Sequence, residues 1–229
     1  MLCVTLLQLE LHAAQSVQAD IGIYGGTVCA LSASVAAARM NISAAIIEPS
    51  PHLWGMTAGG LSGADLKMPL GGIALEFFSS LGHLPFPNFE PHVANDTANA
   101  LLSGAGPGVI TVISSAGGIS AVQRAGSRVT SVLLASGVLA SAAYWIDCSY
   151  DGDLLRLSGT AWAVGREAIA EFNESLGGVD GPPWASGRLN VSPWLDTTRN
   201  ETLLPTVAAT PKASPPGSGD ALVQVKKSS

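Results

Sequence analysis

The chain has 229 residues, of which 47% are hydrophobic and only 12% are charged, and its formal net charge is −6. This composition excludes disorder for most of the length, and 11 basic against 17 acidic residues argue against a nucleic-acid partner. Three cysteines are too few for a disulfide framework, and no apolar run reaches the roughly 18 residues of a membrane span.

The first 19 residues are apolar and end in the sequence VQA, which resembles the small-residue cleavage site of a signal peptide. A positively charged start is missing, however, and Glu10 and His12 are polar. Residues 1–19 are therefore either a cleaved signal peptide or a leader before the first strand. Five Asn-x-Ser/Thr triplets give weak support to secretion. The protein is secreted on the first reading and cytoplasmic on the second.

A strand–turn–helix–strand unit follows the leader. Residues 20–24 predict a short strand, and residues 25–30 form the glycine-rich turn GGTVCA. The Ala-rich stretch that follows predicts a helix up to Met40, and Asn41 suits the left-handed position that ends a helix. Residues 43–47 then predict a second apolar strand. This order of elements is the one that dinucleotide-binding folds require.

The turn of this unit is a modified GxGxxG fingerprint. Gly25 is intact, Thr27 replaces the second glycine next to Gly26, and Ala30 is an accepted third residue. Glu48 ends the second strand, 23 residues after Gly25, where an acid that binds ribose is expected after roughly 20 residues. We therefore predict a dinucleotide site, with an ordinary βαβ unit and a glycine-rich turn as the alternative.

The segment after Glu48 distinguishes a flavin from a nicotinamide cofactor. It reads PSPHLWGMTAGGLSGADL and contains four glycines. Nicotinamide sites usually continue into a plain helix, whereas this pattern is typical of backbone that lies along an extended FAD. A flexible glycine-rich loop without a ligand is the alternative.

Five motifs in order make the chain resemble a family of FAD-dependent oxidoreductases. They are YGGT at 24–27, HLWGMTAGGL at 52–61, FEPHVA at 89–94, DCSYDGDL at 147–154 and GRE at 165–167. The resemblance implies an α/β fold: a Rossmann-like FAD-binding domain with a parallel sheet, helices and an antiparallel β-meander crossover. An incomplete substrate domain would follow, since members of this family are much longer, and we expect the chain to be truncated.

The resemblance also implies FAD as the cofactor and a set of contacts near its phosphates and ribose. Gly25, Gly26 and Thr27 would contact the pyrophosphate, and Glu48 would hold the adenosine ribose. The other implied contacts are Gly55, Met56, Thr57 and Gly59 at the ribityl and flavin, His52 in the same loop, Ile119 at the adenine through its backbone, and Cys148 and Ser149 at the pyrophosphate.

Two residues depart from the family's pattern. Trp54 replaces a glycine of the loop, which adds bulk where backbone is expected near the cofactor. Cys148 replaces a small alanine.

The remaining sequence predicts helices and strands around this site. Helices are expected at 71–83, at 91–103 with Pro91 in the first turn, and at 154–157, where Asp153 is a candidate cap. Strands are expected at 109–113, 119–123, 128–134 and 138–146, the last three as an antiparallel meander. We predict domains at 20–160 for FAD binding and at 161–205 for the start of a substrate domain, and a disordered tail at 206–229.

The candidates for catalysis are weak. His92 is a candidate proton donor near the substrate, with a packing or helix-end role as the alternative. Arg166 is a candidate substrate or flavin ligand, with a surface or interdomain ion pair as the alternative. Asp151 and Asp153 are too few for a metal cage, and the cysteines lack metal-site spacing, so we expect no metal.

These observations predict an FAD-dependent oxidoreductase that transfers a hydride from an organic small-molecule substrate to the flavin. The first alternative is a non-catalytic or truncated FAD-binding remnant. The second is an NAD(P)-binding Rossmann protein, which fits only the first 50 residues or so. We also expect self-association through the exposed edge of an incomplete domain.

Overall fold

The computed structural model describes residues 16–61, 63–64, 69–81, 88–163, 165, 167–175, 177–178 and 217–219. These residues belong to two units, one that extends to Ala161 and one that starts at Trp162. Residues 1–15 of the predicted leader and most of the predicted tail lie outside the described residues, as do Cys3 and Arg166.

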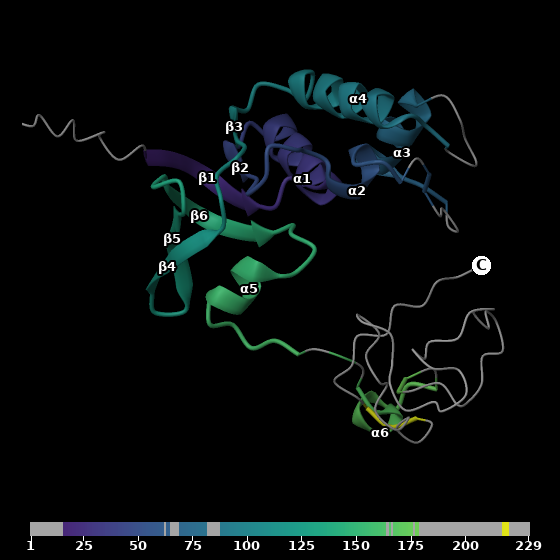
Figure 1. Cartoon of the computed structure of the whole chain (residues 1–229), viewed down its shortest axis with the longest axis vertical. Coiled ribbons are helices and arrows are strands. Elements are labelled where there is room, and N and C mark those ends of the chain that lie inside the picture. The colour runs from purple at the N-terminus through teal and green to yellow at the C-terminus, as the bar shows by residue number, and fades with distance from the viewer. Residues whose placement is uncertain are drawn as a thin grey trace, which may run out of the picture. The chain divides into compact units, whose positions relative to one another are not determined.

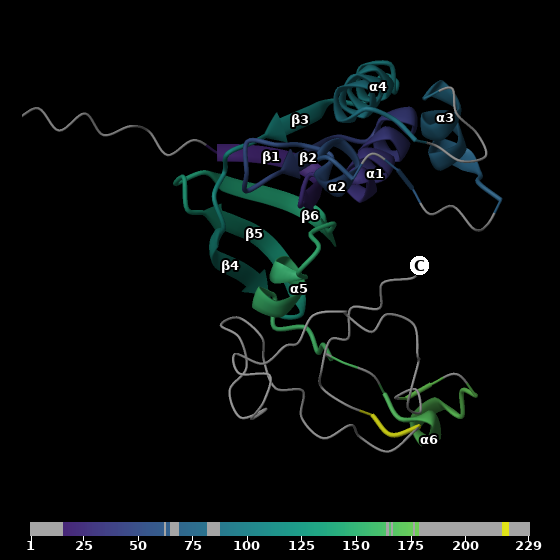
Figure 2. The same cartoon turned by 45° about the vertical axis from the view of Figure 1, so that its right-hand side comes forward.

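A six-stranded sheet with the order β3-β2-β1-β6-β5-β4 organises the first unit (Figures 1 and 2). Its strands are β1 (Ser16–Tyr24), β2 (Ala44–Ile47), β3 (Ile110–Ile113), β4 (Ile119–Ala125), β5 (Arg128–Leu134) and β6 (Leu139–Asp147). The neighbours β3, β2, β1 and β6 pair in parallel, and β4, β5 and β6 pair antiparallel. The predicted α/β fold with a parallel sheet and a β-meander crossover is therefore confirmed.

The helices of the first unit cover both faces of this sheet. They are α1 (Val28–Arg39), α2 (Gly55–Ala58), α3 (Gly72–Ser80), α4 (Pro91–Ser103) and α5 (Asp153–Leu157), and the second unit contains α6 (Ile169–Phe172). Helices α1 and α4 lie on one side of the parallel strands and α5 on the other (Figure 1). None of the helices in the described residues has the length and apolar character that crossing a membrane requires.

Alternating side chains of the parallel strands supply two hydrophobic cores. Ile23 and Ile46 face α1 and α4, whereas their neighbours Tyr24 and Ile47 face the meander. All four are at most 1% exposed, as expected for strands that are covered on both faces.

Strand β1 begins earlier than the sequence predicts. It starts at Ser16 rather than at residue 20, and its first four residues pair with Leu139 to Ala142 of β6. The last four residues of the predicted leader therefore form part of the sheet.

A glycine in the middle of β1 makes room for the aromatic ring of Trp145 on β6. A Cβ on Gly22 would lie 2.6 Å from two atoms of that ring. We expect Gly22→Ala to lower the free energy of unfolding by about 1–3 kcal/mol, because the ring or the strand must shift. Urea denaturation followed by far-UV circular dichroism measures this change.

Gly118→Ala is the matched control, since nothing lies within 4 Å of a Cβ at that position. It should change the free energy of unfolding by less than about 0.5 kcal/mol. Equal losses in the two variants would contradict the steric explanation.

Candidate functional site

The turn between β1 and α1 touches the loop that follows β6. Gly25 has a φ of +91°, and a Cβ there would lie 2.5 Å from the backbone nitrogen of Ser149. Its own N–H donates to the carbonyl of Ile47 at 2.8 Å. Only glycine meets both the positive φ and the close approach of the two backbones.

Thr27 explains how the turn functions without the second glycine of the fingerprint. Its φ is −84°, so no left-handed conformation is needed, and its side chain is 6% exposed. The hydroxyl accepts the N–H of Cys29 at 3.2 Å, as an N-cap of α1, and donates to the carbonyl of Cys148 at 2.9 Å. The threonine side chain therefore points into the protein and holds the turn against the loop after β6.

The carboxylate of Glu48 closes the turn from the side of β2. Its Oε2 accepts the N–H of Gly26 at 2.6 Å, and its Oε1 accepts the N–H of Ser50 at 2.8 Å. A Cβ on Gly26 would lie 2.8 Å from Leu53 and 3.0 Å from Glu48. A side chain at Gly26 would therefore crowd both Glu48 and the loop after β2.

The loop between β3 and β4 lies beside Glu48. Residues 115–117 donate three backbone hydrogen bonds of 2.8–3.1 Å to the carbonyls of residues 48–50. Ile119 follows this loop as the first residue of β4, and its backbone lies close to the hydroxyl of Tyr24. The residue predicted to pair with adenine is therefore at the Glu48 end of the sheet.

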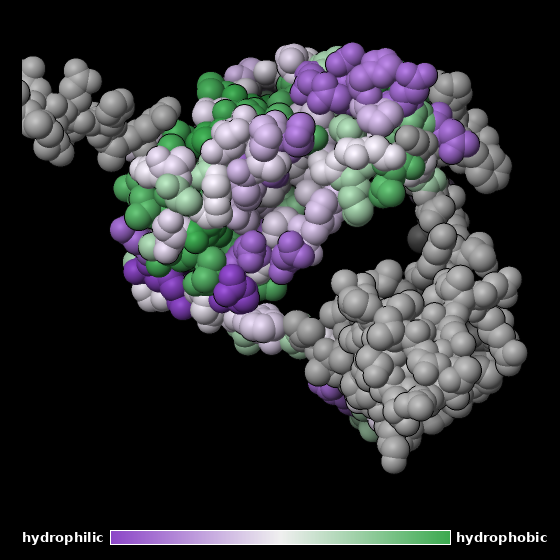
Figure 3. All heavy atoms as spheres, in the orientation of Figure 1, coloured by the Kyte–Doolittle hydropathy of each residue, from purple (hydrophilic) through white to green (hydrophobic). Residues whose placement is uncertain are grey.

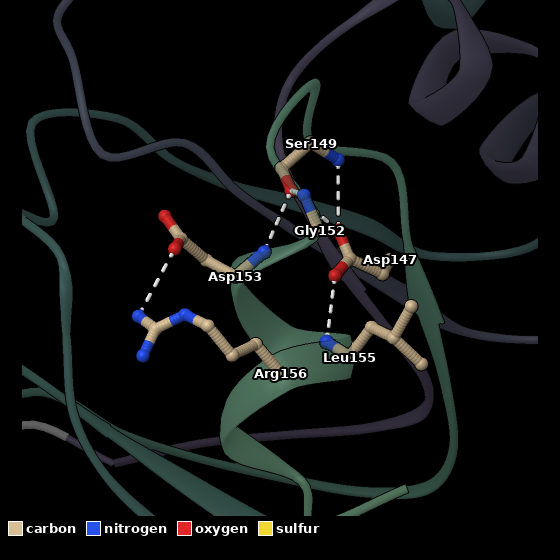
Figure 4. Close-up of polar contacts among 6 residues, drawn as sticks. All are labelled: Asp147, Ser149, Gly152, Asp153, Leu155 and Arg156. Carbon is tan, nitrogen blue, oxygen red and sulfur yellow. Dashed lines mark hydrogen bonds and ion pairs between the residues drawn. The ribbon is translucent and has the colours of Figure 1, made fainter. Parts of the chain in front are cut away.

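The loop after β6 is organised by Asp147 and Ser149 (Figure 4). One carboxylate oxygen of Asp147 accepts the N–H and the hydroxyl of Ser149, and the other accepts the N–H of Leu155. The Ser149 hydroxyl in turn accepts the N–H groups of Gly152 and Asp153. These two side chains accept two of the free amides at the start of α5, those of Asp153 and Leu155.

Asp153 is therefore not the cap of α5, contrary to the sequence prediction. It is the first residue of that helix, and its carboxylate faces Arg156 at 3.3 Å. The residue before the helix is Gly152, in a left-handed conformation.

The loop after β2 is anchored by Trp54. The bulk that the sequence adds at this position is packed inside the protein: the Trp54 side chain is fully buried, and its Nε1 donates to Asn99 of α4 at 3.1 Å. Its φ of +70° is the conformation that favours glycine. The backbone N–H of Trp54 donates to the carbonyl of Gly26, which ties this loop to the turn.

Helix α2 in the same loop meets the side chain of Tyr150. The Met56 N–H donates to the Tyr150 hydroxyl at 2.8 Å, and this hydroxyl lies so close to Gly55 that a Cβ there would clash. Tyr150 itself is 58% exposed. It lies within the motif DCSYDGDL, but nothing in the local sequence indicates its contact with α2.

A cavity of about 580 Å³ brings residues of two predicted sites together. His52 and Gly59 line it from the loop after β2, and His92 and Asn95 line it from α4. Hydrophilic side chains gather over α4 beside it (Figure 3). His92 is exposed, and its Nδ1 lies 3.3 Å from Oε2 of Glu90. His92 and His52 are thus neighbours, whereas Arg166 lies outside the described residues.

The arrangement fits the adenosine and pyrophosphate parts of a dinucleotide. The first turn of α1 contains no acidic residue, and its amides favour an anion such as a phosphate. Gly25 and Gly26 keep the adjacent backbone free of side chains. Each oxygen of Glu48 accepts one backbone N–H and retains a lone pair for a ribose hydroxyl.

Tyr24 lies beneath this edge and gives the site a measurable pH dependence. Burial raises the pKa of Tyr24 from 10.0 to about 12, and the carboxylates of Asp153, Asp147 and Glu48 add to the shift. The neutral hydroxyl is thus favoured in the folded protein, so its stabilising effect is present below pH 10 and is lost as the pH rises toward about 12.

We expect the difference in unfolding free energy between the wild type and Tyr24→Phe to fall over this alkaline range. Urea denaturation at a series of pH values measures it. Tyr144→Phe, which removes a tyrosine hydroxyl at a residue that is 70% exposed, serves as the control. A difference for Tyr24→Phe that stays constant with pH would contradict the assigned cause.

Several solved structures resemble this chain at low sequence identity. THI4 from Thermovibrio ammonificans shares 18% identity with a TM-score of 0.46, over 61% of this chain and 61% of its own. L-amino acid deaminase from Proteus vulgaris shares 11% with a TM-score of 0.46, over 68% and 54%. Bacillithiol disulfide reductase Bdr from Staphylococcus aureus shares 14% with a TM-score of 0.42, over 59% and 38%. The chain thus spans less than two thirds of each of these proteins.

Comparison with protein families assigns the chain to a family. A search among curated proteins found no match. The family described as FAD dependent oxidoreductase matches residues 20–214, which is most of the chain and includes the turn, Glu48 and the loop after β6. This match favours FAD over the nicotinamide alternative. The chain belongs to the family of FAD-dependent oxidoreductases, and FAD is the cofactor that this family implies.

Proposed function

We propose that this chain forms the FAD-binding part of an oxidoreductase that transfers a hydride from an organic substrate to the flavin. The cavity of about 580 Å³ that His52, Gly59 and His92 line carries the proposal. Its size lies within the roughly 300–1,000 Å³ that is usual for small-molecule sites. It borders the loop after β2, which would lie along the flavin.

The residues at the carboxyl edge of the sheet would hold and orient the cofactor. The 25–27 turn and the first amides of α1 would bind the pyrophosphate, and Glu48 would bind the adenosine ribose. Residues 55–59 would border the ribityl chain and the ring system. The bound flavin supplies the redox chemistry by accepting the hydride, and the protein determines which substrate carbon faces it.

His92 is the proposed acceptor of the accompanying proton. An alcohol or amine that gives up a hydride from carbon also loses a proton from oxygen or nitrogen, and a histidine at the cavity is suited to take it. The carboxylate of Glu90, 3.3 Å from Nδ1, favours the tautomer in which Nε2 is free to accept.

The binding role of Glu48 is tested by Glu48→Gln. One carboxylate oxygen becomes an NH₂ group that faces the N–H of Gly26 or of Ser50, neither of which can accept a hydrogen bond, and the negative charge is lost. We expect FAD affinity to fall about tenfold or more, as for a lost charge-assisted hydrogen bond. Fluorescence titration with FAD gives the dissociation constant.

Glu76→Gln is the matched control. Glu76 forms an exposed ion pair with Arg39 at 2.6 Å on α3, away from the turn. This variant should bind FAD as the wild type does. Equal FAD affinities of the Glu48 and Glu76 variants would contradict a role for Glu48 in FAD binding.

Hydride transfer is tested by mixing the FAD-loaded protein, without oxygen, with a panel of alcohols, amines and amino acids. We expect one class to bleach the oxidised flavin band, more slowly when the reacting carbon carries deuterium. His92→Asn should slow this reduction by about 10²-fold or more without changing FAD content. A loaded protein that no substrate reduces would instead support the alternative of a non-catalytic FAD-binding chain.

A further inference from the structure

Two cysteines that are far apart in the sequence meet beside the 25–27 turn. Cys29 lies in the first turn of α1 and is exposed, whereas Cys148 follows β6 and is buried. Burial and the nearby Cys29 thiol raise the pKa of Cys148, which indicates that the two side chains lie close together, and both thiols are free. Nothing in the proposed oxidoreductase reaction uses this pair.

Backbone contacts hold the two cysteines in this position. The hydroxyl of Thr27 accepts the N–H of Cys29 at 3.2 Å and donates to the carbonyl of Cys148 at 2.9 Å. The N–H of Cys148 donates to the carbonyl of Tyr24 at 2.7 Å. A disulfide requires Cα atoms roughly 4.4–6.8 Å apart, and one threonine side chain that bridges both residues keeps the two backbones near each other.

We propose that Cys29 and Cys148 are a redox-sensitive thiol pair that a hydroperoxide converts into a disulfide. The exposed Cys29 sulfur attacks the peroxide oxygen, the O–O bond breaks, and a sulfenic acid and water (or an alcohol) are formed. The Cys148 thiol then attacks the Cys29 sulfur, the S–O bond breaks, and a second water leaves. The two thiols lose two electrons and two protons, and the peroxide is reduced.

The different burial of the two thiols determines which of them reacts first with the oxidant. An oxidant in solution reaches the exposed Cys29, whereas Cys148 is shielded by burial, which also raises the pKa of its thiol and disfavours the more reactive thiolate. A small thiol reverses the reaction by exchange at the exposed Cys29 sulfur.

The disulfide would also affect cofactor binding, and this part of the inference rests on the proposed function. It links the first turn of α1 to the loop after β6, the two segments that would border the pyrophosphate. FAD bound against both segments should oppose closure of the link, and a closed link should weaken FAD binding by the same factor. We therefore expect bound FAD to slow disulfide formation several-fold.

The thiol pair is tested on the protein without added FAD. After treatment with hydrogen peroxide, mass analysis of a non-reducing digest should find the Cys29 peptide joined to the Cys148 peptide, and dithiothreitol should separate them. Cys29→Ser should remove the link, and Cys3→Ser should retain it. Oxidation of Cys29 without a link, or a link from either cysteine to Cys3, would overturn the proposal.

The coupling is tested by repeating the oxidation with the FAD-loaded protein. Slower formation of the link than in the FAD-free protein supports the coupling, and an unchanged rate overturns it. A protein that binds FAD normally but forms no link would overturn the thiol pair and leave the proposed function standing. A protein that forms the link but binds no FAD would overturn the proposed function and leave the thiol pair standing.

Discussion

The close contact between Gly25 and the backbone of Ser149 sets the geometry of the carboxyl edge of the sheet. It follows from the parallel pairing of β1 with β6, which brings the turn after one strand and the loop after the other to the same edge. A side chain at Gly25 would force the two segments apart. The hydroxyl bridge of Thr27 and the Tyr24–Cys148 backbone bond depend on this spacing.

Local sequence signals predict much of the fold. Helix α4 has the predicted bounds because Pro91 suits a helical first turn, and β5 lies where its apolar pattern places it. Asn41 adopts the expected left-handed conformation, with a φ of +58°. The start of β1 was missed because its first residues, which carry a weak strand pattern, are stabilised by pairing with β6. A partner strand that lies so far away in the sequence cannot be inferred from the residues around Ser16.

The candidate site is less predictable than the fold. The fingerprint indicates Gly25, Gly26 and Glu48, since spacing and residue type carry that signal. Tertiary contacts determine the rest: Trp54 adopts a glycine-like φ because its ring is buried against α4, and Ser149 caps α5 together with Asp147. The proximity of Cys29 and Cys148 likewise depends on which strands are neighbours in the sheet. The spacing of the motifs does not predict this.

The central claim is that the edge formed by the turn, Glu48 and the loop after β6 holds FAD. Its most direct test is the visible absorption spectrum of the purified protein after FAD is added and the excess is removed by desalting, with circular dichroism on the same sample. The account predicts a retained flavin band with one FAD per chain. A folded protein that retains no flavin would contradict it.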